Sequence, residues 1–100
     1  MDRKSIEWSE KFTEDVENVV AYLVYNWSKK TALSFIDKLN NKIDFITYSP
    51  FSGIPYRKYK NIYKILVTKH NALFYKIYDN RIELLNLFDT RQNPSKSPFL

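Results

Sequence analysis

The spacing of apolar residues changes at Pro50, and this change constrains the fold more than any other feature of the sequence. Before Pro50, apolar side chains recur every three or four residues, the spacing of one face of an α-helix. After Pro50, short runs rich in Ile, Val, Leu, Tyr and Phe are separated by polar turn residues, as in β-strands. The chain therefore has to pack helices from its first half against a sheet from its second half.

Two helices are predicted in the first half. Ser9 and Ser28 are each suited to cap a helix, because a serine hydroxyl accepts a hydrogen bond from a backbone N–H of the first turn. Pro50 ends the second helix, since the residue before a proline is biased away from helical geometry. The pattern predicts helices over residues 9–26 and 29–48. A connection this short makes the two helices an antiparallel hairpin.

Strands are predicted over residues 5–8, 62–68, 72–78 and 81–88. Residues 56–59 are a candidate for a further short strand. The order of the elements is then β-α-α-β-β-β. We expect a single α+β domain over residues 1–100, in which the helix hairpin packs on one face of an antiparallel sheet and leaves the other face open. The tail, about residues 92–100, contains two prolines and is expected to be irregular.

The periodicity also predicts which side chains are buried. The aliphatic residues expected in the core are Leu23, Ile36, Leu39, Ile43, Ile65 and Leu84. The aromatic residues expected mostly in the core are Trp8, Phe12, Trp27, Phe35 and Phe45. The acidic residues Glu14, Asp15 and Glu17 are interpreted as a solvated helix face, not as a catalytic carboxylate pair.

The composition excludes several kinds of site. The chain has no cysteine and one histidine, so disulfides and thiolate metal sites are excluded and a histidine metal site is not expected. We expect no metal and no cofactor. No apolar stretch is long enough to span a bilayer, and the polar N-terminus does not resemble a signal peptide, so we expect a cytoplasmic protein without membrane contact.

The net positive charge of the chain comes from its second half. Residues 1–50 have a net charge of −1 and residues 51–100 a net charge of +6, within a total of +5. A basic region on one side of a protein suits a polyanion or an acidic protein partner. It is also compatible with a solubilising surface that has no specific partner.

A basic and aromatic segment lies between the second helix and the first long strand of the second half. Arg57, Lys58 and Lys60 alternate with Tyr56 and Tyr59, and cations beside stacking rings are typical of nucleic-acid surfaces. The alternative is a sheet edge that lysines protect from aggregation. Sequence alone leaves these two interpretations open.

Lys69 and His70 lie in the predicted turn between residues 62–68 and 72–78. His70 is the only side chain whose ordinary pKa lies near neutrality, which makes it a candidate general base or target contact. The alternative is an exposed turn histidine with no function.

Several segments lie in a characteristic order and spacing from Trp8 to about Pro94. They are Trp8-Ser9, Ala32, Phe35-Ile36, Tyr48-Ser49-Pro50, Gly53, Tyr63-Lys64-Ile65-Leu66-Val67, Leu73-Phe74-Tyr75-Lys76-Ile77, Ile82-Glu83-Leu84-Leu85 and Phe88-Asp89-Thr90-Arg91-Gln92-Asn93-Pro94. The last of these is the most specific. Together these segments resemble the RelE/ParE superfamily of bacterial toxins.

The resemblance implies a toxin of a type II toxin–antitoxin system, held inactive in a hetero-oligomer by a cognate acidic antitoxin. It further implies contact with operator DNA through the antitoxin. RelE-like members cleave mRNA in the ribosomal A site, ParE-like members poison DNA gyrase, and some members have lost toxicity. The resemblance alone therefore leaves the target open.

The nuclease residues of RelE-like members map only partly onto this chain. Lys64 and Arg91 occupy two of the expected cationic positions and would be the catalytic residues if the protein is a metal-independent endoribonuclease. Leu66 and Ala72 stand where the resemblance implies a lysine and an arginine, and no tyrosine follows Tyr78. Lys64 also suits a plain solvated strand position, and Arg91 a pairing with a nearby acid.

These observations order three hypotheses. The first is a ParE-like toxin that binds a protein target such as DNA gyrase. The second is a RelE-like mRNA endoribonuclease with a reduced catalytic set. The third is a non-toxic relative that retains only its antitoxin-binding role.

Overall fold

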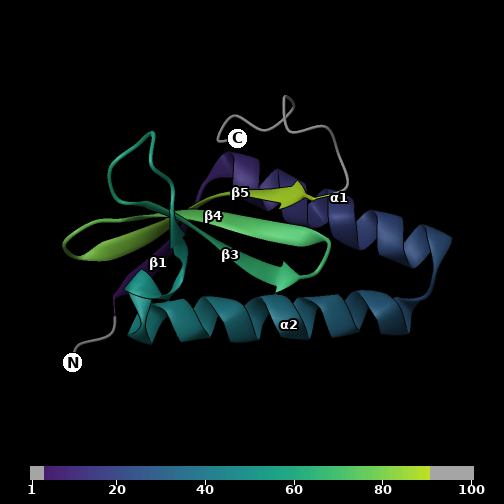
Figure 1. Cartoon of the computed structure of the whole chain (residues 1–100). Helices are drawn as coiled ribbons and strands as arrows, with labels where there is room; N and C mark the ends of the chain where they lie inside the picture. The colour runs from purple at the N-terminus through teal and green to yellow at the C-terminus, as the bar shows by residue number, and fades with distance from the viewer. Residues whose placement is uncertain (1–3, 91–100) are drawn as a thin grey trace.

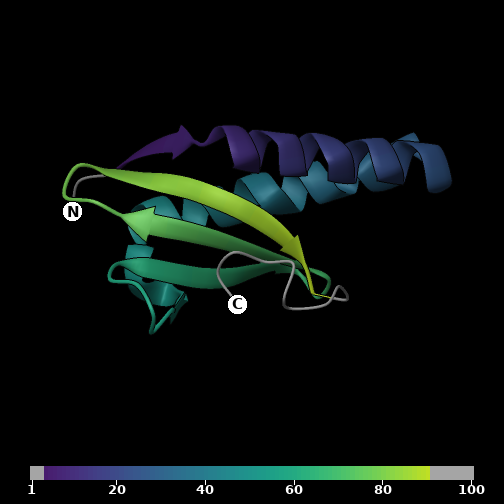
Figure 2. The same cartoon turned by 90° about the horizontal axis from the view of Figure 1, so that it is seen from above.

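The computed structural model describes residues 4–90. The elements follow one another as β1 (Ser5–Trp8), α1 (Glu10–Asn26), α2 (Lys29–Tyr48), the 3₁₀ turn η1 (Pro50–Ser52), β2 (Ile54–Pro55), β3 (Ile62–Thr68), β4 (Asn71–Ile77) and β5 (Arg81–Asp89). The five strands form one sheet in the order β1-β5-β4-β3-β2, and the helix hairpin lies along it (Figures 1 and 2). The predicted α+β fold class is confirmed.

The sheet is mixed. Strands β2 to β5 are antiparallel to their neighbours, as predicted, but β1 pairs with β5 in parallel, from Ser5 opposite Arg81 to Trp8 opposite Leu84. The candidate strand at residues 56–59 does not form. Its place in the sheet is taken by the two-residue strand β2, and the segment after β2 is a loop closed by a 2.8 Å hydrogen bond from Tyr56 N to the carbonyl of Ile62.

Serine caps begin both helices, as the sequence predicts. Ser9 Oγ accepts a hydrogen bond from Phe12 N at 3.0 Å, and Ser28 Oγ accepts one from Thr31 N at 3.0 Å. Ser9 Oγ also donates to the carbonyl of Leu85, so the first cap fixes α1 against β5. No helix among residues 4–90 is apolar over a length that could cross a membrane.

The main core lies between the helix hairpin and the sheet, and its contents correct some of the predictions. Among the predicted aliphatic residues, Leu39, Ile43 and Leu84 are buried, whereas Leu23, Ile36 and Ile65 are partly buried and pack against this core. Of the five aromatic residues, Phe12 and Phe35 are buried, but Trp8, Trp27 and Phe45 are exposed. Trp27 is exposed because the sheet does not extend under the ends of the helices at their connection (Figure 2).

Asp15 is buried, contrary to the prediction that it belongs to a solvated helix face. Its side chain is 10% exposed. Asp15 Oδ2 accepts a hydrogen bond from Leu87 N at 2.9 Å, and Oδ1 pairs with Lys11 Nζ. Strand β1 ends opposite Leu84, so the amide of Leu87 has no strand partner on that edge of β5. Asp15 satisfies this amide and attaches α1 to the sheet.

We predict that Asp15→Ala destabilises the fold by about 1–3 kcal/mol, because the buried amide of Leu87 loses its acceptor. Urea unfolding monitored by circular dichroism measures the change. Glu14→Ala is the matched control, since Glu14 is exposed and its loss should alter stability by less than about 0.5 kcal/mol. Equal stability of the two variants would contradict this role of Asp15.

Candidate functional site

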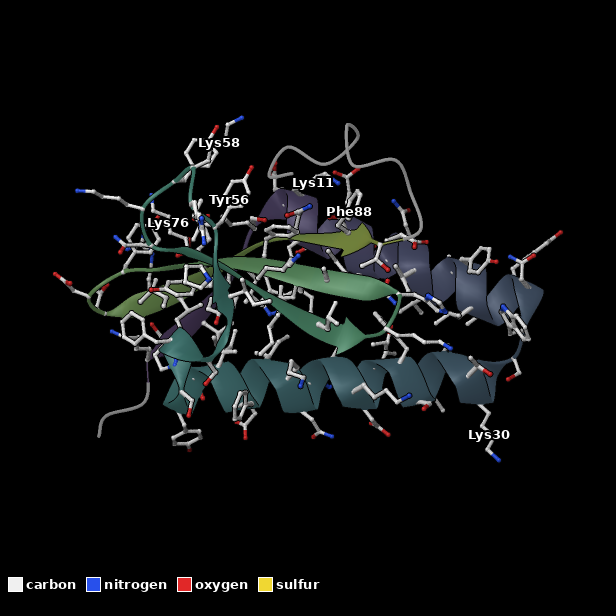
Figure 3. The ribbon with its side chains drawn as sticks, in the orientation of Figure 1. Lys11, Lys30, Tyr56, Lys58, Lys76 and Phe88 are labelled. Atoms are coloured by element: carbon white, nitrogen blue, oxygen red, sulfur yellow. The ribbon has the colours of Figure 1, made fainter. Side chains whose placement is uncertain are left out.

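The sheet face turned away from α2 is only partly basic. It carries a second apolar cluster, with Ile62, Ala72, Phe74 and Phe88 buried and Tyr56 packed against it. Figure 3 shows Tyr56, Lys58, Lys76 and Phe88 on this side of the sheet. The cations on this face therefore lie around an apolar centre.

The loop of residues 56–61 holds Arg57, Lys58 and Lys60 together at one end of this face, all exposed. The rings of Tyr56 and Tyr59 stack at 5.8 Å, and Tyr56 meets Phe74 edge-on at 6.3 Å. The predicted association of cations with stacked rings is thus present in space. Because the two tyrosines already stack on each other and on the sheet, the rings also serve to fix the loop.

Lys69 and His70 lie at the other end of β3, in the turn before β4. Thr90 fixes this turn, because its N–H donates to the carbonyl of His70 at 2.9 Å and its hydroxyl to the carbonyl of Lys69 at 3.0 Å. A strand advances about 3.3 Å per residue, so the seven residues of β3 separate this turn from the loop of residues 56–61 by roughly 20 Å. The structure therefore does not bring the two sets of candidate residues together.

Cations near the β4–β5 connection are balanced by acids. Lys76 Nζ and the Arg81 guanidinium lie 5.1 and 3.8 Å from the centre of the Tyr78 ring. Tyr78 Oη donates a hydrogen bond to Glu83, and Arg81 Nε lies 3.6 Å from the carboxylate of Glu7. This cluster stabilises the hairpin and adds little net charge to the face.

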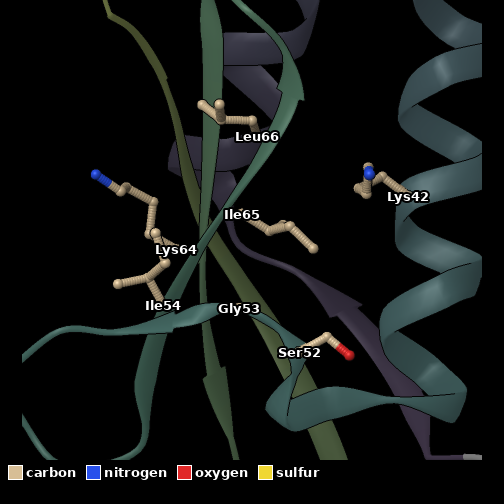
Figure 4. Close-up of a pocket in the computed structure, with 7 residues that line it drawn as sticks. All are labelled: Lys42, Ser52, Gly53, Ile54, Lys64, Ile65 and Leu66. Atoms are coloured by element: carbon tan, nitrogen blue, oxygen red, sulfur yellow. The ribbon is translucent and has the colours of Figure 1, made fainter.

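A groove of about 280 Å³ lies between α2 and β3 (Figure 4). Its lining residues are Lys42, Ser52, Gly53, Ile54, Lys64, Ile65 and Leu66. The lining is mostly apolar, its charged members are two lysines, and it contains no acid. Strand β2 pairs only with Lys64 and Tyr63, so within residues 4–90 the outer edge of β3 beyond Lys64 has no strand partner. The groove thus combines apolar surface, positive charge and a free strand edge.

Tyr75 supports Gly53, a lining residue of this groove, from the buried side of the sheet. Its hydroxyl donates to the carbonyl of Pro50 at 2.7 Å and accepts from Gly53 N at 3.2 Å. A Cβ at Gly53 would lie 2.6 Å from Tyr75 Oη and 2.8 Å from the carbonyl oxygen of Lys64, so only glycine fits. Burial raises the pKa of Tyr75 to about 12. The partners of Tyr75 are 22 and 25 positions away in the sequence, so no local pattern identifies this residue.

The nuclease positions do not assemble a catalytic set among residues 4–90. Lys64 lies partly exposed on β3, while Leu66 places an apolar side chain, 49% exposed, two residues further along the same face. Ala72 is 2% exposed and pairs with Phe88 in the sheet, which leaves little space for an arginine. Arg91 lies outside the described residues. No cluster of potential metal ligands occurs within residues 4–90.

Comparison with known proteins identifies the family. The family model for the ParE toxin of the type II toxin–antitoxin system parDE matches residues 6–94. The chain therefore belongs to this family of toxins. A search of curated proteins gives no match.

Several solved structures share the fold. A chain of the chromosomal ParDE toxin–antitoxin system from P. aeruginosa superposes with a TM-score of 0.74 at 12% identity, covering 87% of this chain and 96% of that one. The YoeB dimer from Staphylococcus aureus gives 0.62 at 20% identity, with coverages of 91% and 100%. A chain of the E. coli DinJ-YafQ toxin–antitoxin complex gives 0.59 at 18% identity, with coverages of 88% and 93%.

The raised pKa of Tyr75 predicts a specific loss of stability at high pH. Between pH 10 and about 12 the tyrosine ionises in the unfolded chain but not in the folded one, so its contribution is complete below pH 10 and is lost as pH rises. The loss should reach roughly 2–3 kcal/mol. Urea unfolding across this range should show the slope in the wild type and not in Tyr75→Phe. An identical slope in both proteins would contradict the assignment.

Proposed function

We propose that this toxin inhibits growth by binding a protein target such as DNA gyrase and that it performs no chemistry on RNA. The observation that carries the proposal is the state of the nuclease positions on the sheet. Leu66 offers no charge, and Ala72 is buried beneath its neighbours. Of the expected cations, only Lys64 lies within residues 4–90.

Metal-free RNA cleavage requires several groups near one phosphate. Cations must stabilise the pentavalent transition state, and an acid must protonate the leaving oxygen. Lys58 and Lys60 lie at one end of β3 and His70 at the other, so neither group replaces the missing residues around Lys64. Separation of the charged groups therefore supports a binding toxin over a nuclease.

Purified toxin should inhibit DNA supercoiling by gyrase and leave ribosome-bound mRNA intact. Lys64→Ala should retain nearly full growth inhibition, because that lysine carries no transition-state charge in a binding toxin. Supercoiling assays and primer extension on translated mRNA measure the two activities.

Cleavage of ribosome-bound mRNA by the wild-type chain would overturn the proposal in favour of a RelE-like endoribonuclease. In that case Lys64→Ala and Arg91→Ala should each lower the cleavage rate by roughly a hundred- to a thousandfold, the usual effect of losing one electrostatic contact. Absence of both activities and of growth inhibition would favour the non-toxic alternative.

We further propose that a cognate acidic antitoxin neutralises this toxin by inserting an apolar and acidic segment into the groove between α2 and β3. Ile65 and Lys42 lie on the α2 side of the groove, whereas Ile54, Lys64 and Leu66 lie at its rim and extend to the opposite sheet face; together they offer apolar side chains and two lysines to a segment laid along the edge of β3. A segment that folds on binding would bury the apolar surface and align with the free edge of β3. The resulting hetero-oligomer would contact operator DNA through the antitoxin, in the cytoplasm.

The affinity of toxin for antitoxin should fall as salt concentration rises, because ions screen the attraction between lysines and carboxylates. Lys42→Glu should weaken binding by about tenfold or more, ~1.4 kcal/mol. Lys58→Glu is the matched control, since it makes the same charge change on a loop outside the groove. Isothermal titration calorimetry that finds equal affinities for the two variants would place the antitoxin elsewhere.

A further inference from the structure

The connection between the two helices carries a group of exposed aromatic and aliphatic side chains that the core does not use. Every residue from 24 to 31 is exposed. Tyr25 is 90% and Trp27 70% exposed. We call this group the hairpin tip; it consists of Tyr22, Val24, Tyr25, Trp27 and Leu33 together with Lys29 and Lys30.

Hydrogen bonds fix the backbone of the hairpin tip despite its exposure. Trp27 N and Ser28 N both donate to the carbonyl of Leu23 at 3.0 Å, which ends α1. Ser28 caps α2 immediately afterwards through Thr31 N. The backbone that carries the rings is therefore fixed before binding, and little backbone entropy remains to be lost when they bind a partner.

The hairpin tip projects beyond the sheet. In Figures 1 and 2 the two helices continue past the ends of β3, β4 and β5, so the connection between them has no strand beneath it. Burial begins again at Ala32. The exposed rings are thus not needed to close the core, and their position leaves them accessible to another molecule.

The charge of the hairpin tip defines the partner. Lys29 and Lys30 are the only charged residues between Glu17 and Asp37 in the sequence. Tyr and Trp are the residue types that most often dominate the binding energy of protein interfaces. Rings with two neighbouring lysines and no acid fit a protein surface that offers an apolar pocket bordered by carboxylates.

Other partners fit the hairpin tip less well than such a protein surface does. Two copies meeting tip to tip would bring four lysines together without an acid between them. Two lysines give at most a weak attraction to a nucleic acid or to an anionic membrane, since each such contact contributes little alone.

We propose that the hairpin tip is the surface through which this toxin contacts its protein target, and that it is separate from the groove assigned to the antitoxin. The inference rests on the proposed function, because a nuclease that acts on RNA would not need a surface for binding a target protein. Tyr25 and Trp27 supply the apolar anchors, and Lys29 and Lys30 pair with carboxylates of the target.

The double variant Tyr25→Ala/Trp27→Ala tests this proposal. It should lower inhibition of purified gyrase by about thirtyfold or more, the effect of losing an interface hot spot. Growth inhibition should fall in parallel, while affinity for the antitoxin stays within about twofold of the wild type, which also shows that the variant folds. The double variant Lys29→Glu/Lys30→Glu should also lower inhibition of gyrase and of growth. Tyr48→Ala is the control, because it removes an exposed ring from the other end of α2.

Each outcome decides the proposal. The wild type could inhibit growth without inhibiting gyrase or cleaving mRNA. If the tip variants then lost growth inhibition, gyrase would be rejected as the target and the hairpin tip would be supported as the binding surface. Full growth inhibition by the tip variants would overturn the inference. The inference would also be overturned if the tip variants lost antitoxin binding, lost binding to RNA or vesicles that the wild type shows, or lost a homodimer that the wild type forms. Each of these results would assign the hairpin tip to another partner.

Discussion

The attachment of α1 to the edge of β5 determines where the other surfaces lie. Asp15 accepts the hydrogen bond of Leu87 N and Ser9 donates to Leu85, so α1 runs along the edge of β5 that β1 leaves uncovered. The short connection at Ser28 then directs α2 back along the sheet towards β3. This one arrangement creates the groove beside β3, leaves the opposite sheet face free of any helix within residues 4–90, and extends the helix ends beyond the described strands.

The local sequence pattern predicted which helices form, but it did not predict which of their side chains are buried. Helical spacing, the caps at Ser9 and Ser28, and the stop at Pro50 predicted both helices and their hairpin, because each signal acts within one turn of the chain. The burial of Asp15 and the exposure of Trp27 could not be predicted in this way. Both depend on where β5 ends relative to α1, which is a contact between residues about seventy positions apart.

The sequence identified candidate residues for the site, but it could not show how all the parts of the site come together in the fold. The sequence correctly associated the cations of the loop of residues 56–61 with its tyrosines, since neighbours in a short loop are neighbours in space. It also placed Lys69 and His70 in the turn after residues 62–68, at the end of β3 opposite this loop. It could not show that Tyr75, Gly53 and Pro50 meet behind the groove, because three separate elements have to be folded first.

The central claim is that this toxin acts through two separate binding surfaces. Amide hydrogen exchange on the free toxin, on its complex with antitoxin and on its complex with the target protein tests the claim most directly. The account predicts that antitoxin slows exchange in residues 64–68 and leaves residues 24–31 unchanged, whereas the target slows exchange in residues 24–31. Protection of the same residues by both partners would contradict it.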